Sequence, residues 1–264
     1  MMIFANNLLK DKTAIVTGGG TGIGRSIAME LAKVGANIVI CSRKMEHLTP
    51  TSEEIRGMGV SCLSLQTDIR DIKAVHKTVQ TTIDEFGRID ILVNNAGGQF
   101  AAPAESFSEN QWNAVINNNL NGTWYITQAV AKKWMIPNRV GKIINIVACI
   151  RRGMPGIAHT GAARAGIVNL TKSLSIEWAK YNILINCIAP GNIHTDGWKN
   201  AYGVESMEAI RSQIPLQRLG RPEDIAFAVV YLASPAGDYV TGETIAIDGG
   251  QQHWGNIDYS ATSV

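Results

Sequence analysis

The stretch "KTAIVTGGGTGIGRSIAMELAKVG" (12–35) decides the fold of this chain. It begins as a short apolar run that enters three consecutive glycines at 18–20, which is typical of a buried strand followed by a turn. From residue 23 the apolar side chains recur at helical spacing, and the pattern stops at Gly35. Glycines let backbone amides approach a pyrophosphate, whose charge is favoured at the start of a helix. The strand, turn and helix therefore predict a dinucleotide site, and a purely structural glycine turn is the alternative.

The same alternation of strand and helix continues along the chain. Further strands are expected at 37–42, 60–66, 88–98, 141–150, 182–191 and 243–250, and helices at 44–57, 71–86, 109–136 and from 159 onwards. The strands are nearly continuous apolar runs, as is typical when both faces of a sheet are covered. We therefore expect an α/β protein with a single domain over 1–264. Its core would be a doubly wound parallel sheet of about seven strands with helices on both faces, the Rossmann fold.

Composition and charge exclude several classes of protein. The chain has 264 residues, of which 45% are hydrophobic and 17% charged, and its net charge is only +2 with the charges scattered. This gives no electrostatic case for nucleic acid, and no apolar run approaches the roughly 20 residues that span a membrane. The four cysteines have no metal-binding spacing, so we expect free thiols and no metal site. No secretory signal or peroxisomal address is recognisable, and a cytoplasmic location is the expectation.

In a sheet of this kind, ligands bind at the carboxyl ends of the strands. The cofactor contacts expected there are Gly18, Thr21, Gly22, Ile23 and Gly24 after the first strand, Ser42 and Arg43 after the second, Asp68 and Ile69 after the third, Asn95, Ala96 and Gly97 after the fourth, and Pro190, Gly191, Ile193 and Thr195 after the sixth. Asp68 could accept a hydrogen bond from the adenine amino group, cap the following helix, or do both.

The end of the second strand distinguishes between the two nicotinamide dinucleotides. A ribose 2′-hydroxyl requires a carboxylate there, whereas a 2′-phosphate requires a cation. The chain reads Cys41-Ser42-Arg43-Lys44, with no acid. Arg43 can form two hydrogen bonds with a phosphate and Ser42 can donate to it, so the sequence favours NADP(H). The alternative is that Arg43 is an ordinary solvated residue.

Several motifs together resemble the classical short-chain dehydrogenase/reductase superfamily over roughly residues 10–250. They are Thr17-Gly18 with Gly22 and Gly24, Asn94-Asn95-Ala96-Gly97, Asn119 in "NNLNG", and Pro190-Gly191 with Thr195. The segments "NNAGGQFAAPAE" (94–105) and "HTGAARAGIVNLTKSLSIEWA" (159–179) resemble peroxisomal trans-2-enoyl-CoA reductases. "CSRKMEHL" (41–48) is also similar to 2,4-dienoyl-CoA reductases. The resemblance implies NADPH, reduction of a carbon–carbon double bond conjugated to an acyl thioester, and a homotetramer.

The chain departs from the usual active site of this superfamily, which has a Ser after the fifth strand and then Tyr-x-x-x-Lys. Thr160 and Arg164 stand in place of the Tyr and Lys, and Val147 or Ala148 stands in place of the Ser. A threonine is a far poorer acid than a phenol, and a guanidinium effectively never releases a proton. Reduction of a ketone therefore loses its usual proton donor.

An enoyl thioester requires hydrogen bonds to an enolate oxygen instead. The candidate catalytic residues are Thr160, His159 and Asn119, the last through ordered water. Arg164 lies one turn after Thr160 on the same helix face, where the resemblance implies contact with the nicotinamide ribose. The alternatives are a structural ion pair for Arg164, an N-cap for Thr160 and a capping or solvated role for His159.

These residues leave three functional hypotheses open. The first is an NADPH-dependent reductase of 2-enoyl-CoA. The second is an oxidoreductase of 3-ketoacyl or small alcohol substrates that uses His159 or water as the acid, and the third is a cofactor-binding protein with little turnover. The segment 192–215 could form a lid, and its Trp198 and Tyr202 could line an acyl tunnel or the core.

Two further segments have open roles. Arg151 and Arg152 could contact CoA phosphates or lie in a solvated loop. The tail 251–264 could fold over a neighbouring subunit.

Overall fold

A seven-stranded parallel sheet forms the centre of the protein. The computed structural model describes residues 3–195, 197 and 206–253. The strands are β1 (Thr13–Thr17), β2 (Asn37–Ser42), β3 (Cys62–Gln66), β4 (Ile91–Asn94), β5 (Gly141–Ile146), β6 (Ile183–Pro190) and β7 (Thr244–Ile247). Their order across the sheet is β3-β2-β1-β4-β5-β6-β7. The chain therefore reverses its direction of winding between β1 and β4, which is where ligands bind in such sheets.

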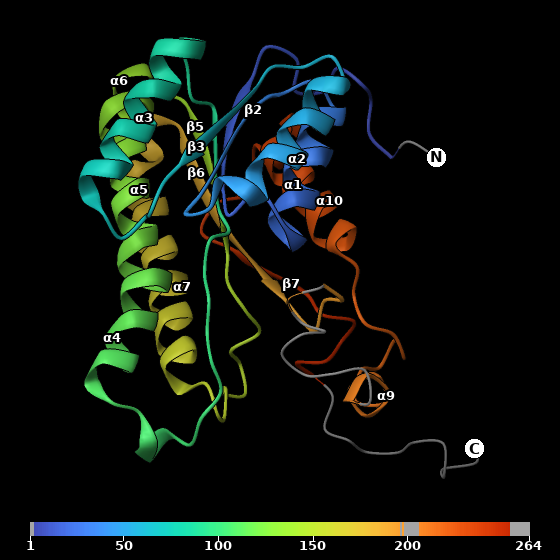
Figure 1. Cartoon of the computed structure of the whole chain (residues 1–264). Helices are drawn as coiled ribbons and strands as arrows, with labels where there is room; N and C mark the ends of the chain where they lie inside the picture. Colours follow the sequence, from blue (N-terminus) through green and yellow to red (C-terminus); the bar gives the residue numbers. More distant parts are fainter. Residues whose placement is uncertain (1–2, 196, 198–205, 254–264) are drawn as a thin grey trace.

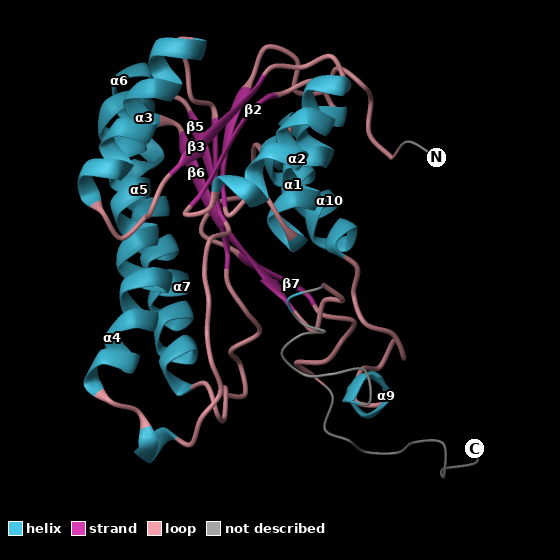
Figure 2. Ribbon diagram, viewed as in Figure 1, coloured by secondary structure: helices cyan, strands magenta, loops and turns pink. Residues whose placement is uncertain are grey.

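Helices cover both faces of the sheet (Figure 1). Their bounds are α1 (Gly22–Lys33), α2 (Met45–Gly57), α3 (Ile72–Phe86), α4 (Glu109–Ile116), α5 (Gly122–Val130), α6 (Ile136–Asn138), α7 (Ala158–Trp178), α9 (Ser206–Arg211) and α10 (Pro222–Ala233). Helices α1, α2 and α10 lie on one face, while α3 to α7 lie on the other (Figure 2). No helix in the described ranges is long and apolar enough to cross a membrane.

The alternation of side chains along each strand builds a separate core on each face. In β1, Ala14 and Val16 pack into the core beneath α1 and α10, whereas Ile15 packs into the core on the opposite face. Both faces of the strand are fully buried, which explains why the strands are continuous apolar runs. The predicted doubly wound sheet of seven strands is confirmed.

Two elements differ from the predicted pattern. The expected helix over 109–136 is interrupted by single π-helical turns at Asn117–Asn121 and Ala131–Met135. Helix α10 is absent from the prediction, although Pro222 at its first position and an apolar run are ordinary features of a helix start. It packs against α1 and completes the layer on that face.

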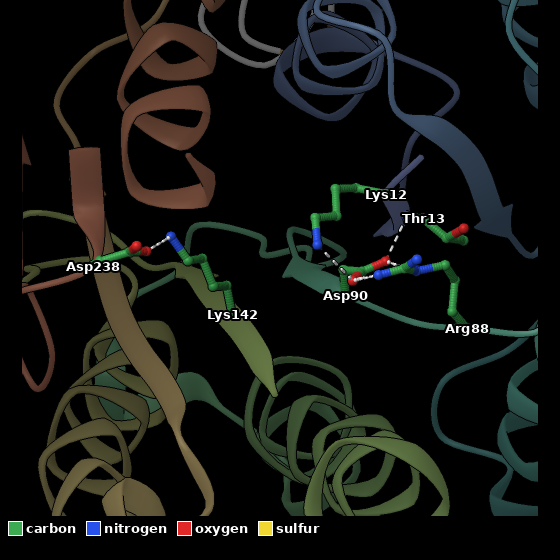
Figure 3. A network of polar contacts seen from close by, with 6 residues as sticks. All are labelled: Lys12, Thr13, Arg88, Asp90, Lys142 and Asp238. Carbon is green, nitrogen blue, oxygen red and sulfur yellow. Dashed lines mark hydrogen bonds and ion pairs between the residues drawn. The ribbon is translucent and has the colours of Figure 1, made fainter. Parts of the chain in front are cut away.

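A buried carboxylate joins β1 to β4 at the end of the sheet opposite the cofactor edge (Figure 3). Asp90 is 5% exposed and accepts a hydrogen bond of 2.9 Å from the backbone N–H of Thr13. The guanidinium of Arg88 donates to both of its oxygens, at 2.7 and 2.6 Å. Lys12 forms an ion pair with it at 3.4 Å. These contacts hold the amino-terminal ends of two central strands together.

Candidate active site

The glycine-rich turn after β1 is fitted closely to its surroundings. Gly18 and Gly22 have φ angles of 66° and 52°, which favour glycine. A Cβ at Gly24 would collide with the carbonyl oxygen of Gly18. The side chain of Asn95 donates to the carbonyl oxygens of Thr17 and Gly18 at 3.0 and 3.3 Å. The first residues of α1 therefore line a cavity, as a binding site for a pyrophosphate requires.

The first cavity has a volume of about 650 Å³ and runs along the carboxyl ends of β1 to β4. Its walls include the predicted contacts Gly18, Thr21, Gly22, Ile23, Gly24, Ser42, Arg43, Asp68, Ile69, Asn95, Ala96, Gly97 and Thr195. The walls of this cavity also include Lys44, His47 and Asn118, which were not among the predicted site residues. The glycine turn, the helix start and a cationic end of the cavity fit a dinucleotide phosphate.

The residues after β2 carry the cationic end. Ser42 Oγ donates to the carbonyl oxygen of Lys44 at 3.0 Å, which fixes this turn. Lys44 pairs with Glu46 at 3.1 Å. Arg43 forms no ion pair within the described ranges, and its charge helps to lower the pKa of Asp68 on the same cavity wall. Its guanidinium therefore lines the cavity without a directly bound acid among the described residues.

Asp68 has a partner of its own. Arg70 donates to both of its carboxylate oxygens, and this hydrogen bonding lowers the pKa of Asp68. Helix α3 is capped by Asp71, whose side chain accepts from the N–H of Lys73 at 2.8 Å. The alternative that Asp68 caps this helix is therefore wrong. The signal for the real cap, an Asp directly before the helix, was present in the sequence.

A second cavity of about 530 Å³ lies beyond the ends of β4, β5 and β6. The predicted contacts on its walls are Ile23, Asn95, Gly97, Arg164, Pro190 and Gly191. It shares Ile23, Asn95 and Gly97 with the first cavity, so the two adjoin. Val147 and Ala148, one of which stands in place of the usual Ser, also line it, and neither has a hydroxyl.

Arg164 is the buried cation of the second cavity. Its Nη1 donates to the carbonyl oxygen of Ile146 at 2.9 Å. A Cβ on Gly97 would collide with its Nη2, so the guanidinium lies directly against the turn after β4. Burial lowers the pKa of Arg164 to about 10, which leaves it positively charged near neutral pH. None of the described acids forms an ion pair with it, so the described residues give no support to the alternative of a structural salt bridge.

Asn119 lies in the π-helical turn between α4 and α5 and is buried. Its Nδ2 donates to the carbonyl oxygens of Gly98 and Val115 at 2.8 and 2.9 Å. Its Oδ1 accepts from the N–H of Gly98 at 3.3 Å. Asn119 lines neither of the two cavities, and both of its amide hydrogens are engaged. The two hydrogen bonds between Asn119 and Gly98 hold the backbone of Gly98 in place.

His159 and Thr160 are both buried in the first turn of α7. The backbone N–H of Thr160 donates to Nδ1 of His159 at 2.8 Å, and the Thr160 hydroxyl lies 3.3 Å from the same nitrogen. Contrary to the position that we expected, neither residue is on the described walls of the two cavities. The N-cap of α7 is Ile157, so the alternative of a capping role for Thr160 is wrong.

Other expected residues fall elsewhere. Ile193 is buried, pairs with Gly220 and lines a third cavity rather than either of these two. Trp198 and Tyr202 lie outside the described residues. Of the tail, Gln251 and Gln252 line the second cavity, and residues from 254 onwards lie outside the described part.

Cys149 is a cavity residue that was not singled out as part of the site. It follows β5 and lines the second cavity, with its thiol 3.3 Å from the carbonyl oxygen of Ala189. Burial raises the pKa of the Cys149 thiol to about 12. The group therefore stays protonated and is a neutral part of the wall. None of the described His, Cys, Asp and Glu residues cluster in a way that could hold a metal ion.

A doubly wound sheet with a glycine-rich turn at its winding reversal, and with an adjoining cavity that holds a buried cation, defines a nucleotide-dependent oxidoreductase. Residues 18–252 match the family described as enoyl-(acyl carrier protein) reductase. The chain belongs to the short-chain dehydrogenase/reductase family. Members of this family with this fold use a nicotinamide cofactor, and the cavities described here fit one.

Curated relatives are similar to this chain over nearly its whole length. A probable 2,4-dienoyl-CoA reductase of Bacillus subtilis (strain 168) is 38% identical over 92% of this chain and 97% of its own length. The 2-dehydro-3-deoxy-D-gluconate 5-dehydrogenase of Escherichia coli (strain K12) is 39% identical over 94% of this chain and 98% of its own. The similarity to dienoyl-CoA reductases, noted above from residues 41–48, is confirmed.

Solved structures agree with this assignment. A short-chain dehydrogenase from Bacillus anthracis superposes with a TM-score of 0.87 at 42% identity, covering 95% of this chain and 100% of that one. A citronellol catabolism dehydrogenase of Pseudomonas aeruginosa PAO1 superposes with a TM-score of 0.86 at 38% identity, covering 95% and 98%.

Proposed function

We propose that this oxidoreductase is an NADPH-dependent reductase of the carbon–carbon double bond in 2-enoyl-CoA or a similar conjugated acyl thioester. One observation carries the proposal. The substrate-sized cavity beside the dinucleotide site contains a buried guanidinium, Arg164, and the described part of its wall has no phenol, imidazole or carboxyl group. Such a wall suits a reaction whose developing charge needs stabilisation more than an immediate proton.

The chemistry follows from the groups on the wall. Arg164, Pro190 and Gly191 would hold the nicotinamide end of the cofactor, which would supply the hydride for the β-carbon of the enoyl thioester. Negative charge then moves to the thioester oxygen, and Arg164 offers positive charge and N–H donors to it. Its pKa of about 10 keeps the guanidinium protonated near neutral pH, so it can donate hydrogen bonds to the enolate oxygen. The α-carbon then takes its proton from water.

The remaining site residues have supporting roles in this proposal. Arg164 also binds the nicotinamide ribose hydroxyls, and Asn119 positions the turn at Gly98 above the cofactor. His159 and Thr160 are buried next to the second cavity and stabilise the first turn of α7. For Thr160 to donate a hydrogen bond to the substrate, this turn would have to move. Ile193 supports the segment after β6.

The preference for NADP(H) is part of the proposal. Arg43 carries no ion pair within the described part of the chain, and Lys44 lies beside it on the cavity wall. Ser42 holds the turn that presents both. A 2′-phosphate would meet cations there, whereas a 2′-hydroxyl would find no carboxylate at the end of β2.

Two relatives point to two reactions. The dienoyl-CoA reductase of B. subtilis supports reduction of a conjugated thioester. The E. coli gluconate dehydrogenase supports a second candidate, oxidation or reduction at a carbonyl carbon. We favour the first because the described cavity wall offers no phenol, imidazole or carboxyl group to protonate an alkoxide. A single domain over residues 1–264, a homotetramer and a cytoplasmic location complete the proposal.

A substrate panel tests it. NADPH consumption with crotonyl-CoA and longer 2-enoyl-CoA thioesters, but not with 3-ketoacyl-CoA, is the expected result. Turnover of 3-ketoacyl-CoA, sugar acids or alcohols alone would overturn the proposal in favour of carbonyl chemistry. Binding of NADPH, measured by its fluorescence, without turnover of any member of the panel would indicate a cofactor-binding protein.

A further inference from the structure

The second cavity is lined by cations alone among its charged residues. The described part of its wall contains Arg151, Arg152 and Arg164, and it contains no aspartate or glutamate. Arg164 of α7 is buried, and its guanidinium contacts the last residue of β5, whereas Arg151 and Arg152 are exposed in the turn that follows β5. The cavity therefore has one cation in its interior wall and two at its solvent side. A cavity with this distribution attracts an anionic ligand.

Neither of the two exposed arginines forms an ion pair with an acid among the described residues. Arg152 makes no hydrogen bond or ion pair with the described residues. Arg151 makes one contact, of 3.2 Å, with Nδ1 of His253. Asp248 contacts the same wall through the thiol of Cys149, but its carboxylate is occupied by the N–H groups of Gly250 and Gln252 at 2.9 and 2.8 Å. Both guanidinium groups are thus available to a ligand.

We infer that Arg151 and Arg152 bind the phosphate groups of coenzyme A at the mouth of the cavity and so select CoA as the carrier of the acyl substrate. The inference rests on the proposed function, because it places the thioester near Arg164 and the carrier towards solvent. Guanidinium groups match phosphate oxygens in pairs of parallel hydrogen bonds. The alternative carrier, an acidic protein, would require a broad basic surface, but the net charge of the chain is only +2 and its charges are scattered.

Binding of two saturated thioesters tests the inference without turnover. Butyryl-CoA and butyryl-pantetheine share the acyl group and the pantetheine arm, but only butyryl-CoA has the nucleotide phosphates. Their affinities are measured by calorimetry on the protein saturated with NADP⁺. The test variant is Arg151→Gln/Arg152→Gln. The control is Lys10→Gln/Lys132→Gln, which removes the same charge at two exposed positions outside both cavities.

We expect the unmodified protein to bind butyryl-CoA at least about tenfold more tightly than butyryl-pantetheine, because each charge-assisted contact is worth about a factor of ten. The Arg151→Gln/Arg152→Gln variant should bind both thioesters with the weaker affinity, and the lysine control should behave like the unmodified protein. Dephospho-CoA in place of CoA then separates the contribution of the 3′-phosphate from that of the diphosphate.

Equal affinity of the unmodified protein for the two thioesters would overturn the inference while leaving the proposed function intact. An equal loss of affinity for butyryl-CoA and butyryl-pantetheine in the arginine variant would also overturn it, because that result indicates damage to the cavity. Loss of affinity for butyryl-acyl carrier protein, with CoA unaffected, would assign the pair to a protein carrier instead. If butyryl-CoA binds as expected but crotonyl-CoA is not reduced, the proposed function fails and the CoA site stands.

Discussion

The imidazole of His159 stacks on the ring of Phe107, with ring centroids 4.4 Å apart and planes only 10° from parallel. Phe100 approaches the same imidazole edge-on, with centroids at 4.7 Å. Nδ1 lies 2.8 Å from the backbone nitrogen of Thr160, and Nε2 has no hydrogen-bond partner among the described residues. His159 therefore fastens the loop after β4 to the start of α7 as an aromatic side chain.

This burial predicts a pH-dependent stability. Burial lowers the pKa of His159 in the folded protein, whereas the unfolded chain titrates near about 6.5. Below that value the unfolded state binds a proton that the folded state does not, so stability falls as the pH falls towards the lowered pKa. The contribution at pH 5.5 is up to about 1.4 kcal/mol. Urea unfolding at pH 7.5 and 5.5 measures it, and in His159→Asn this part of the dependence should disappear. An unchanged pH dependence in the variant would show that His159 is not responsible.

Arg164 should be required for both turnover and cofactor affinity. Arg164→Ala removes the buried cation, and we expect kcat to fall about 100-fold or more, with weaker binding of NADPH. Arg164→Lys keeps the charge and should lose less. Thr160→Val should be much milder, because Thr160 lines neither cavity. Steady-state kinetics and NADPH titration give these values, and a full-rate Arg164→Ala enzyme would remove the role assigned to this residue.

Arg43 should determine the preference between the two cofactors. In Arg43→Ala we expect KM for NADPH to rise about tenfold, because a charge-assisted contact with the 2′-phosphate is lost. KM for NADH should hardly change. Arg25→Ala is the control, since Arg25 is already paired with Glu54 on the surface of α1. Equal effects on NADPH and NADH would contradict the assignment of the phosphate to Arg43.

The contact between Gly97 and Arg164 can be tested with a neighbouring control. A Cβ at Gly97 would collide with Nη2 of Arg164 and would lie 2.7 Å from Oδ1 of Asn119. Gly97→Ala should therefore displace the guanidinium and lower kcat/KM roughly 10- to 100-fold. A Cβ at Gly98 would meet only Asn118 Nδ2, at 3.4 Å, so Gly98→Ala should stay within about twofold. Similar losses in both variants would mean that the loop backbone, not the guanidinium, is sensitive.

Asp90 should affect stability and leave catalysis unchanged. Replacing it with Asn weakens its contacts with Arg88, Lys12 and Thr13, and we expect a loss of about 2 kcal/mol in the free energy of unfolding. The partners are partly exposed, so the loss stays below that of a fully buried pair. Asp84→Asn, at an exposed position in α3, is the control. Urea unfolding and kcat per folded enzyme separate the two effects, and a large fall in kcat would contradict a purely structural role.

The fold could be predicted because its determinants are local. The apolar runs, the glycine turn after β1 and the helical spacing of α1 each act within a few residues, and parallel strands with short connections leave few topologies. The cofactor edge followed from the same order, since parallel strands end at one edge. The ends of the strands were predicted less accurately. Of the strand expected at 88–98, only Ile91–Asn94 is a strand in the structure.

The side-chain contacts of His159, Asp68 and Asn119 could not be predicted from the sequence. His159 is buried by Phe100 and Phe107, which come from a loop whose path no periodicity describes. The pairing of Asp68 with Arg70 depends on side-chain geometry within a turn. The π-helical turn that places Asn119 has the same apolar pattern as an ordinary helix.

That turn at 117–121 has a consequence for deletions in the gene. A π-helical turn contains one residue more than the α-helical turn it replaces, and it takes up that residue while the helix beyond it keeps its phase. Removal of one amino acid there would restore regular α-helical winding, and Ile126, Ala129 and Val130 of α5 would still face the core beneath the sheet. A library of one-codon deletions should therefore tolerate a deletion within 117–121 better than a deletion within α5, which would rotate the rest of that helix by about 100°.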